Sequence, residues 1–207
     1  MRSCAGALSL LLQLMVAACA SAPIASVYVL GSPVDANEER IARTAGRIQV
    51  SSIAIPDYLN STDILIRHGP HELMPSSTGR WGERLAEGIK DALASDLSAR
   101  LPQNVITAAH DKDPLARQLL LSVSAFDVWA NGRCVLTASW TIFEKGRGPS
   151  LIVAQETIVI PPTITGDTGD SLTVAAMAAA VAMLSDRVAT SVAAIERLPS
   201  ASHSAPR

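Results

Sequence analysis

The sequence predicts an α/β domain in which two main helices pack on a mixed, largely antiparallel sheet. Two stretches, residues 119–128 and 134–143, alternate apolar and polar side chains, and the Asn-Gly pair between them is the strongest short signal for a β-hairpin. Two other stretches, 81–97 and 171–196, repeat apolar residues at helical spacing. A chain that combines such strands and helices folds into packed layers of sheet and helix.

Shorter strand patterns surround these four elements. Residues 47–55 alternate, but the phase slips at Ser51-Ser52, which predicts a β-bulge. Pro56 then ends the strand, because proline cannot donate a ladder hydrogen bond. Further strands are expected at 27–30, 64–66, 72–74, 105–106 and 151–160, the last of which completes a three-stranded meander.

The strand at 134–143 has one apolar face and one face of small and hydroxyl-bearing residues. The apolar phase comprises Cys134, Leu136, Ala138, Trp140 and Ile142. Such alternation is typical of a sheet with one face on the core and one more polar face. We therefore expect Cys134 to be a small buried hydrophobe rather than a reactive thiol.

Each predicted helix has an apolar stripe and an expected cap. The first stripe comprises Trp81, Leu85, Ile89, Leu93 and Leu97. Thr78 is the expected N-cap of this helix, and Pro102 ends it. The second stripe comprises Met177, Val181, Leu184, Val188, Val192 and Ile195. Asp170 or Ser171 is expected to cap the second helix.

Composition excludes several classes of protein. The chain has 207 residues and is 48% apolar, which is enough to bury a core and is not typical of disorder. Its formal net charge is −2, and no run of Lys or Arg occurs. A nucleic-acid partner is therefore not expected.

The N-terminus has the pattern of an exported lipoprotein. Arg2 precedes an apolar stretch at 8–16, which has the length of a secretory signal and is too short for a membrane span. Small residues lead up to Cys19, as in a bacterial lipobox, so 1–18 is interpreted as a signal peptide and Cys19 as the lipidation site. Ordinary cleavage beside a chance cysteine is the alternative. Ala20, in place of Asp, favours the outer membrane by resemblance to enterobacterial sorting rules.

The mature chain is interpreted as one tethered domain. Residues 19–26 form the lipidated N-terminus and a short tether, which spans at most about 25 Å. Residues 27–197 form a single α/β lipoprotein domain. Residues 198–207 are rich in Ser, Ala and Pro and are expected to be a flexible tail.

Several segments of the mature chain resemble one known family. They are Tyr28-Val29-Leu30, Ile55-Pro56-Asp57-Tyr58-Leu59-Asn60, Ile64-Leu65-Ile66-Arg67, Arg80-Trp81-Gly82-Glu83-Arg84-Leu85, Leu101-Pro102 and Phe126-Asp127. Together they resemble the auxiliary lipoproteins of ABC-type envelope transporters, the PqiC/YmbA-like family. The sequence departs from the family pattern at Asn60-Ser61, which replaces an Asp-Arg pair, and at Arg84, which replaces a proline.

The resemblance implies an outer-membrane-anchored, periplasm-facing accessory of a lipid-moving ABC/MCE-type transporter in a Gram-negative bacterium. Its implied partners are a permease, an ATPase and a substrate-binding protein of the MCE/MlaD kind, and a homo-oligomer is compatible with it. It implies no cofactor and no catalysis. The alternative function is an envelope scaffold or assembly factor unrelated to transport.

Two motifs suggest chemistry, and each has a simpler interpretation. Gly169-Asp170-Ser171-Leu172 spells an esterase motif, but such a serine needs a downstream Asp and His. His203 is the sole histidine after the motif, and no Asp closely precedes it. His68, His71 and Glu72 could bind a metal ion, but the Gly-Pro turn between the histidines favours a solvated loop.

The segment Pro56–Asn60 is the candidate docking site. Pro56 should pull the chain out of the sheet, so that Tyr58 and Leu59 expose apolar surface on a protruding loop with Asp57 and Asn60. The alternative is that Tyr58 closes the edge of the core. Arg67, Arg80, Trp81 and Leu85 are assigned to the structural motif of the family.

The substitution Cys19→Ser should leave the domain folded but release it from membranes. Cells labelled with radioactive palmitate and then fractionated should show label in the wild-type protein and in the leader variant Cys4→Ser, and none in Cys19→Ser. An unlabelled wild-type protein would contradict lipidation at this cysteine.

Overall fold

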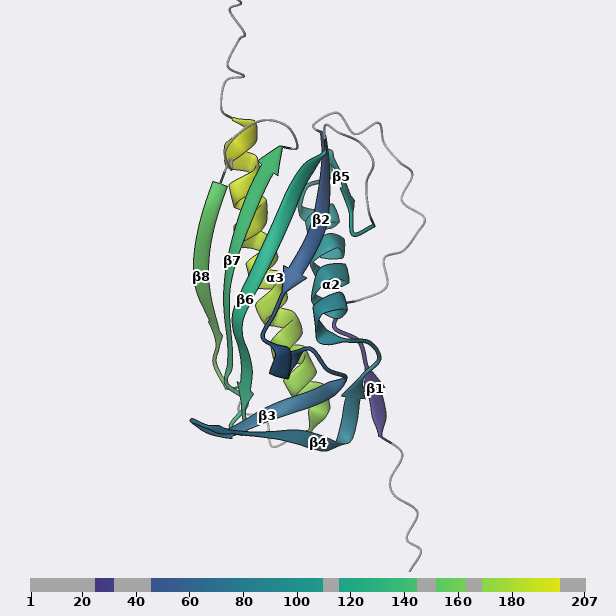
Figure 1. Ribbon diagram of the computed structural model, residues 1–207, viewed down its shortest axis with the longest axis vertical. Helices are drawn as coiled ribbons and strands as arrows, with labels where there is room; N and C mark the ends of the chain where they lie inside the picture. The colour runs from purple at the N-terminus through teal and green to yellow at the C-terminus, as the bar shows by residue number, and fades with distance from the viewer. Residues whose placement is uncertain (1–24, 32–45, 110–115, 145–151, 163–168, 198–207) are drawn as a thin grey trace, which may run out of the picture.

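The computed structural model describes residues 25–31, 46–109, 116–144, 152–162 and 169–197. The predicted signal peptide at 1–18, most of the tether at 19–26 and the tail at 198–207 lie outside these residues. The described residues form a single sheet with helices on one of its faces (Figure 1).

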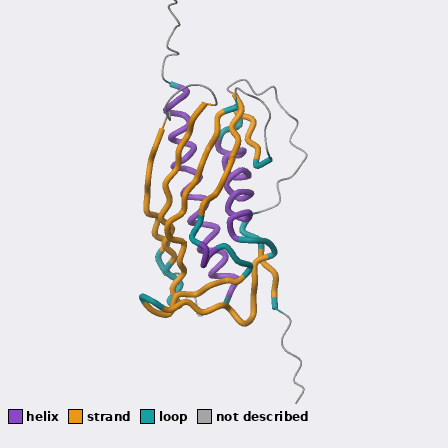
Figure 2. Tube along the Cα trace, viewed as in Figure 1, coloured by secondary structure: helices purple, strands orange, loops and turns teal. Residues whose placement is uncertain are grey.

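In the described part of the chain, the sheet contains eight strands and is accompanied by two long helices. The strands are β1 (Ser26–Tyr28), β2 (Gly46–Ala54), β3 (Asp63–Gly69), β4 (Glu72–Trp81), β5 (Asn104–Thr107), β6 (Arg117–Trp129), β7 (Cys134–Glu144) and β8 (Ile152–Ile160). The helices within the described residues are α2 (Leu85–Arg100), α3 (Asp170–Glu196) and the 3-10 turn η2 (Asp57–Leu59). Figure 2 shows both long helices behind the layer of strands. The predicted α/β class is confirmed.

Strand β6 organises the sheet because three strands pair with it. Along one edge it pairs antiparallel with β7, which in turn pairs antiparallel with β8. Two strands share its other edge. Strand β2 pairs parallel with residues 117–122, and β3 pairs parallel with residues 128–129. Most paired residues lie in the antiparallel pairs, while β1–β4 and β2–β5 add further parallel pairs, so the sheet is mixed and largely antiparallel.

The hairpin and the bulge fall where the sequence predicts them. Gly132 has φ 83° in the turn between β6 and β7, a conformation that favours glycine. In β2 the register to β6 shifts between Val50 and Ser52, so Ser51 is the extra residue of the predicted bulge. The apolar phase of β7 is buried, and the outer phase is partly exposed.

The core lies between the helices and the covered face of the sheet. The stripe of α3 is buried throughout, and so are Leu85, Ile89, Leu93 and Leu97 of α2. Trp140 is 3% exposed and its indole donates a hydrogen bond to the Ser191 Oγ, which joins β7 to α3. By length and composition α3 could cross a membrane, but here its stripe packs on the sheet.

The predicted start of the first helix is wrong. Trp81 is the last residue of β4, and α2 begins at Leu85 after Arg84. Trp81 pairs with Tyr28 of β1, and its N–H donates to the Thr62 carbonyl at 2.7 Å. These strand contacts override the four-residue spacing that aligns Trp81 with the helical stripe. Trp81 is nevertheless buried, as expected for a core residue.

Two predicted caps are also wrong, and one bond network accounts for both. Gly169 occupies the N-cap position of α3, and no side chain caps it. The buried Asp170 carboxylate instead accepts hydrogen bonds from the Ser76 Oγ at 2.9 Å and the Thr78 Oγ1 at 2.7 Å. Thr78 therefore ties β4 to the start of α3 rather than capping α2, and Ser171 is exposed.

Candidate functional site

The predicted docking segment lies at a fork in the sheet. We use this name for residues 123–127 of β6, which lie between the part paired with β2 and the part paired with β3. The segment that joins β2 to β3 passes here and forms the turn η2. Leu59 is 4% exposed and belongs to the core, so the expectation that it offers apolar surface is wrong. Tyr58 is 41% exposed, as a contact residue requires.

A buried ion pair lies next to this turn. The Arg67 Nη2 of β3 is 2.8 Å from the Asp127 Oδ1 of β6, and the two side chains are 14% and 9% exposed. Arg67 Nη1 also donates to the Pro70 carbonyl at 3.2 Å, which holds the guanidinium toward the β3–β4 turn. The hydrogen bond that Arg67 donates to the Asp127 carboxylate is the main reason why the pKa of Arg67 is raised. A charge-assisted bond of this length is among the stronger kinds in proteins.

Tyr58 borders the same ion pair. Burial raises the pKa of its hydroxyl, and the negative charge of Asp127 raises the pKa further, while Arg67 lowers it. The phenol is therefore neutral at physiological pH. Tyr58 thus interacts with both members of the pair, and much of its side chain stays open to solvent.

Trp129 extends this group along the end of β6. The guanidinium of Arg67 lies 5.8 Å from the centroid of the Trp129 ring, and that of Arg133 lies 5.0 Å from it. Both separations are within the range of cation–π attraction. We call Tyr58, Arg67, Asp127, Trp129 and Arg133 the Arg67 cluster.

The Arg67 cluster unites some of the predicted site residues and leaves others apart. Arg80, Trp81 and Leu85 lie at the junction of β4 and α2, where Trp81 and Leu85 are buried and Arg80 is exposed. The sequence interpretation missed Trp129 and Arg133. Trp129 lies two residues after Asp127, at the end of the same long strand. This position could have indicated that Trp129 lies near Asp127.

Cys134 is a buried, unreactive thiol, as predicted. It is fully buried, and burial together with the nearby Asp127 charge raises its pKa to about 12. The thiolate that nucleophilic chemistry requires is therefore scarce at neutral pH.

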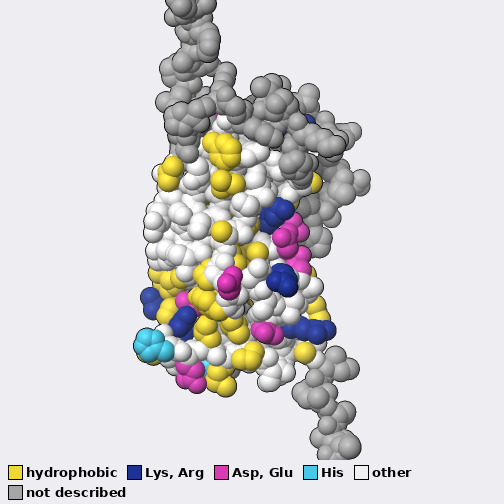
Figure 3. All heavy atoms as spheres, viewed as in Figure 1, with side chains coloured by type: hydrophobic (Ala, Val, Ile, Leu, Met, Phe, Trp, Pro, Cys, Tyr) yellow, Lys and Arg dark blue, Asp and Glu magenta, His cyan; other side chains and the backbone are white. Residues whose placement is uncertain are grey.

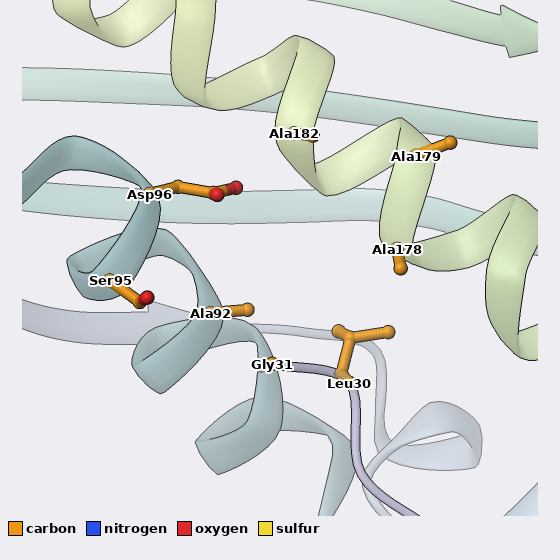
Figure 4. Close-up of a pocket in the computed structure, with 8 residues that line it drawn as sticks. All are labelled: Leu30, Gly31, Ala92, Ser95, Asp96, Ala178, Ala179 and Ala182. Carbon is orange, nitrogen blue, oxygen red and sulfur yellow. The ribbon is translucent and has the colours of Figure 1, made fainter. Parts of the chain in front are cut away.

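A groove between α2 and α3 is a concave feature of the described residues. It has a volume of about 290 Å³ and is lined mainly by small side chains: Leu30, Gly31, Ala92, Ser95, Asp96, Ala178, Ala179 and Ala182 (Figure 4). Its one carboxylate, Asp96, already contacts Arg100 at 3.1 Å and the Ser185 Oγ at 3.1 Å. The groove thus offers no set of convergent polar groups for a small ligand.

The residues of the two motifs with suggested chemistry either take part in structural hydrogen bonds or lie exposed on a turn. Asp170 of the esterase-like motif is engaged by Ser76 and Thr78. His68, His71 and Glu72 lie around the exposed β3–β4 turn. Among the described residues, no group of three or more His, Cys, Asp or Glu side chains is arranged to hold a metal ion.

The fold defines a class of protein, an α/β domain with two long helices on one face of a mixed sheet. A family model for ABC-type transport auxiliary lipoprotein components matches residues 28–189. The chain belongs to this family of lipid-anchored envelope proteins that assist ABC-type transport. A comparison with curated protein sequences finds no match.

Two solved structures share the fold at low sequence identity, and a third matches with a lower TM-score. A crystal structure of an uncharacterized protein has 19% identity and a TM-score of 0.64, and the match covers 81% of this chain and 98% of the other. A Xanthomonas campestris protein of the DUF330 family has 14% identity and a TM-score of 0.60, with 80% and 93% covered. The PelC dodecamer from Paraburkholderia phytofirmans has 16% identity and a TM-score of 0.40, with 73% and 92% covered.

Breaking the Arg67–Asp127 pair from one side should strongly destabilise the domain. Arg67→Ala or Asp127→Ala should each lower the free energy of unfolding by about 3–5 kcal/mol, because the remaining charge stays buried without its partner. The joint change Arg67→Met with Asp127→Leu should cost less than either single change. Urea denaturation measures all three.

The exposed pair between Arg187 and Glu156 provides the control, since these side chains are 56% and 39% exposed. Arg187→Ala should change the free energy of unfolding by less than about 1 kcal/mol. If Arg67→Ala costs no more than Arg187→Ala, the pair does not hold the fork together.

Proposed function

We propose that this protein is a non-catalytic auxiliary lipoprotein of an MCE-type lipid transport system, anchored in the outer membrane through Cys19 and facing the periplasm. Membership of the auxiliary lipoprotein family supports the link to ABC-type transport. The lipobox-like sequence before Cys19 supports lipidation, and Ala20 at the next position supports the outer membrane.

We further propose that the protein docks on its transporter partner through the Arg67 cluster, and this cluster is the single observation that carries the binding role. Tyr, Trp and Arg are the residues that most often dominate the energy of protein interfaces. Here Tyr58 and Trp129 both neighbour Arg67, Arg133 lies over the Trp129 ring, and Tyr58 is 41% exposed. Pro56 and Asn60 flank the turn, and Asp57 is its first residue.

The ordered position of Tyr58 also favours tight binding by a small contact surface. Tyr58 belongs to a one-turn helix whose Leu59 is anchored in the core, and its ring borders a fixed ion pair. Side chains that are already ordered lose less conformational entropy when a partner binds. A partner with an acidic or carbonyl-rich surface would suit the exposed Arg133 beside Trp129.

A binding role fits the remaining chemistry of the described residues. The Cys134 thiol has a pKa of about 12, and the Asp170 carboxylate is engaged by two hydroxyls. These groups serve the fold, so the proposed contribution to transport is recognition and positioning, while the energy comes from the ATPase of the system.

The substitution Tyr58→Ala should weaken co-purification with the MCE-type partner. We expect a loss of affinity of about tenfold or more, as for removal of an interface hot spot. Tyr58→Phe should retain most of the affinity, because the ring supplies most of the contact area. Leu59 stays unchanged in this test because it is buried.

The matched control is Val153→Ala, which changes an exposed apolar side chain on β8, far along the sheet from η2. All variants should keep the thermal unfolding midpoint of the wild type. Equal co-purification of Tyr58→Ala and Val153→Ala would remove the Arg67 cluster from the interface.

A further inference from the structure

Large apolar side chains are exposed at the end of the domain where β1 and β4 lie. Val27 and Val29 are 59% and 56% exposed, and Met74 of β4 is 48% exposed. Val27 and Val29 lie side by side over Gly82, since a Cβ at Gly82 would meet them at 3.2 Å and 3.4 Å. In Figure 3 hydrophobic side chains gather on the lower half of the molecule, where Figure 1 places β1, β3 and β4.

Basic side chains accompany these apolar groups. Arg80 is paired in register with Val27, and Arg80 and Arg84 are both exposed. Exposed acidic residues, including Glu72 beside the β3–β4 turn, are also present at this end. The surface is therefore amphipathic rather than strongly charged. Guanidinium groups beside apolar side chains suit a layer of lipid phosphates over acyl chains.

The position of the proposed lipid anchor indicates that this end of the domain lies nearest to the membrane. Cys19 lies just before Ser26, the first residue of β1, and the tether at 19–26 spans at most about 25 Å. Helix α3 has 27 residues and runs about 40 Å along the molecule, from the end near β4 to the opposite end. A tether of this length holds the β1–β4 end, not the opposite end, at the bilayer.

We propose that the β1–β4 end rests on the membrane surface, with Val27, Val29 and Met74 inserted into the lipid headgroup region. This inference depends on the proposed lipidation of Cys19 and not on the proposed partner. It gives the domain a fixed orientation, with α3 rising away from the bilayer. Tyr58, on the turn between β2 and β3, then lies just above the membrane and stays open to a partner.

Site-specific fluorescence quenching tests the proposal on the lipidated full-length protein. Val29→Cys and Met74→Cys place a label at the β1–β4 end. Val153→Cys on β8 and Met183→Cys on α3 are matched controls, since these side chains are 72% and 40% exposed. The native Cys134 is fully buried and should not react. Each labelled protein is reconstituted into phosphatidylethanolamine and phosphatidylglycerol vesicles with and without nitroxide-labelled lipid.

The expected result is quenching at least about twofold stronger at positions 29 and 74 than at 153 and 183, because inserted groups lie only about 5–10 Å deep, close to a shallow nitroxide. Equal quenching at all four positions would overturn the proposal. Should Val29→Cys not fold, Val27→Cys reports on the same spot.

Flotation of the vesicles distinguishes a missing lipid anchor from a missing contact between the domain and the membrane. Protein that does not float with the vesicles lacks the lipid anchor. In that case both the lipidation of Cys19 and the proposed membrane contact are wrong. Protein that floats without selective quenching contradicts the membrane contact alone. Co-purification with the MCE-type partner is measured independently, so a failed docking site would leave the quenching pattern unchanged.

Discussion

The fold of this domain depends on how β6 shares one of its edges. Because β2 pairs with the first part of that edge and β3 with its end, residues 123–127 lie at a fork where none of the described strands pairs with that edge. The connection from β2 to β3 must fill this space, and the turn η2 does so with Leu59 in the core. The buried Asp127 carboxylate at the fork then requires a cation, and Arg67 of β3 supplies it at 2.8 Å.

The Arg67 cluster follows from this arrangement. The ion pair that joins β3 to β6 interacts with Tyr58, and the guanidinium of Arg67 also lies over the Trp129 ring. A surface built on a core ion pair and a one-turn helix is rigid, in contrast to a surface carried on a long loop. Under the proposed function, stability and recognition draw on the same residues. Variants at Arg67 should then affect both properties, whereas variants at Tyr58 should affect recognition alone.

Much of the fold was predictable because its signals are local and periodic. The Asn-Gly hairpin, the alternation along β7, the bulge at Ser51 and the stripe of α3 all appear in the structure. The failures involve contacts between distant residues. Trp81 has the spacing of a helical stripe, but it pairs with β1 as the last residue of a strand. Asp170 is a residue type that often caps helices, but its carboxylate accepts hydrogen bonds from hydroxyl groups of β4. Likewise, the meeting of Arg67, Asp127 and Trp129 depends on strand pairing, although the family-like segments did include Tyr58, Arg67 and Asp127.

The central claim is that the Arg67 cluster is the face that the transporter partner contacts. Photo-crosslinking in living cells tests it most directly, with a photoreactive amino acid at position 58 and, for comparison, at position 153, whose native valine is 72% exposed. The account predicts an adduct with an MCE-type or ABC transporter component from position 58 and none from position 153. An adduct with such a component from position 153 and none from position 58 would contradict it.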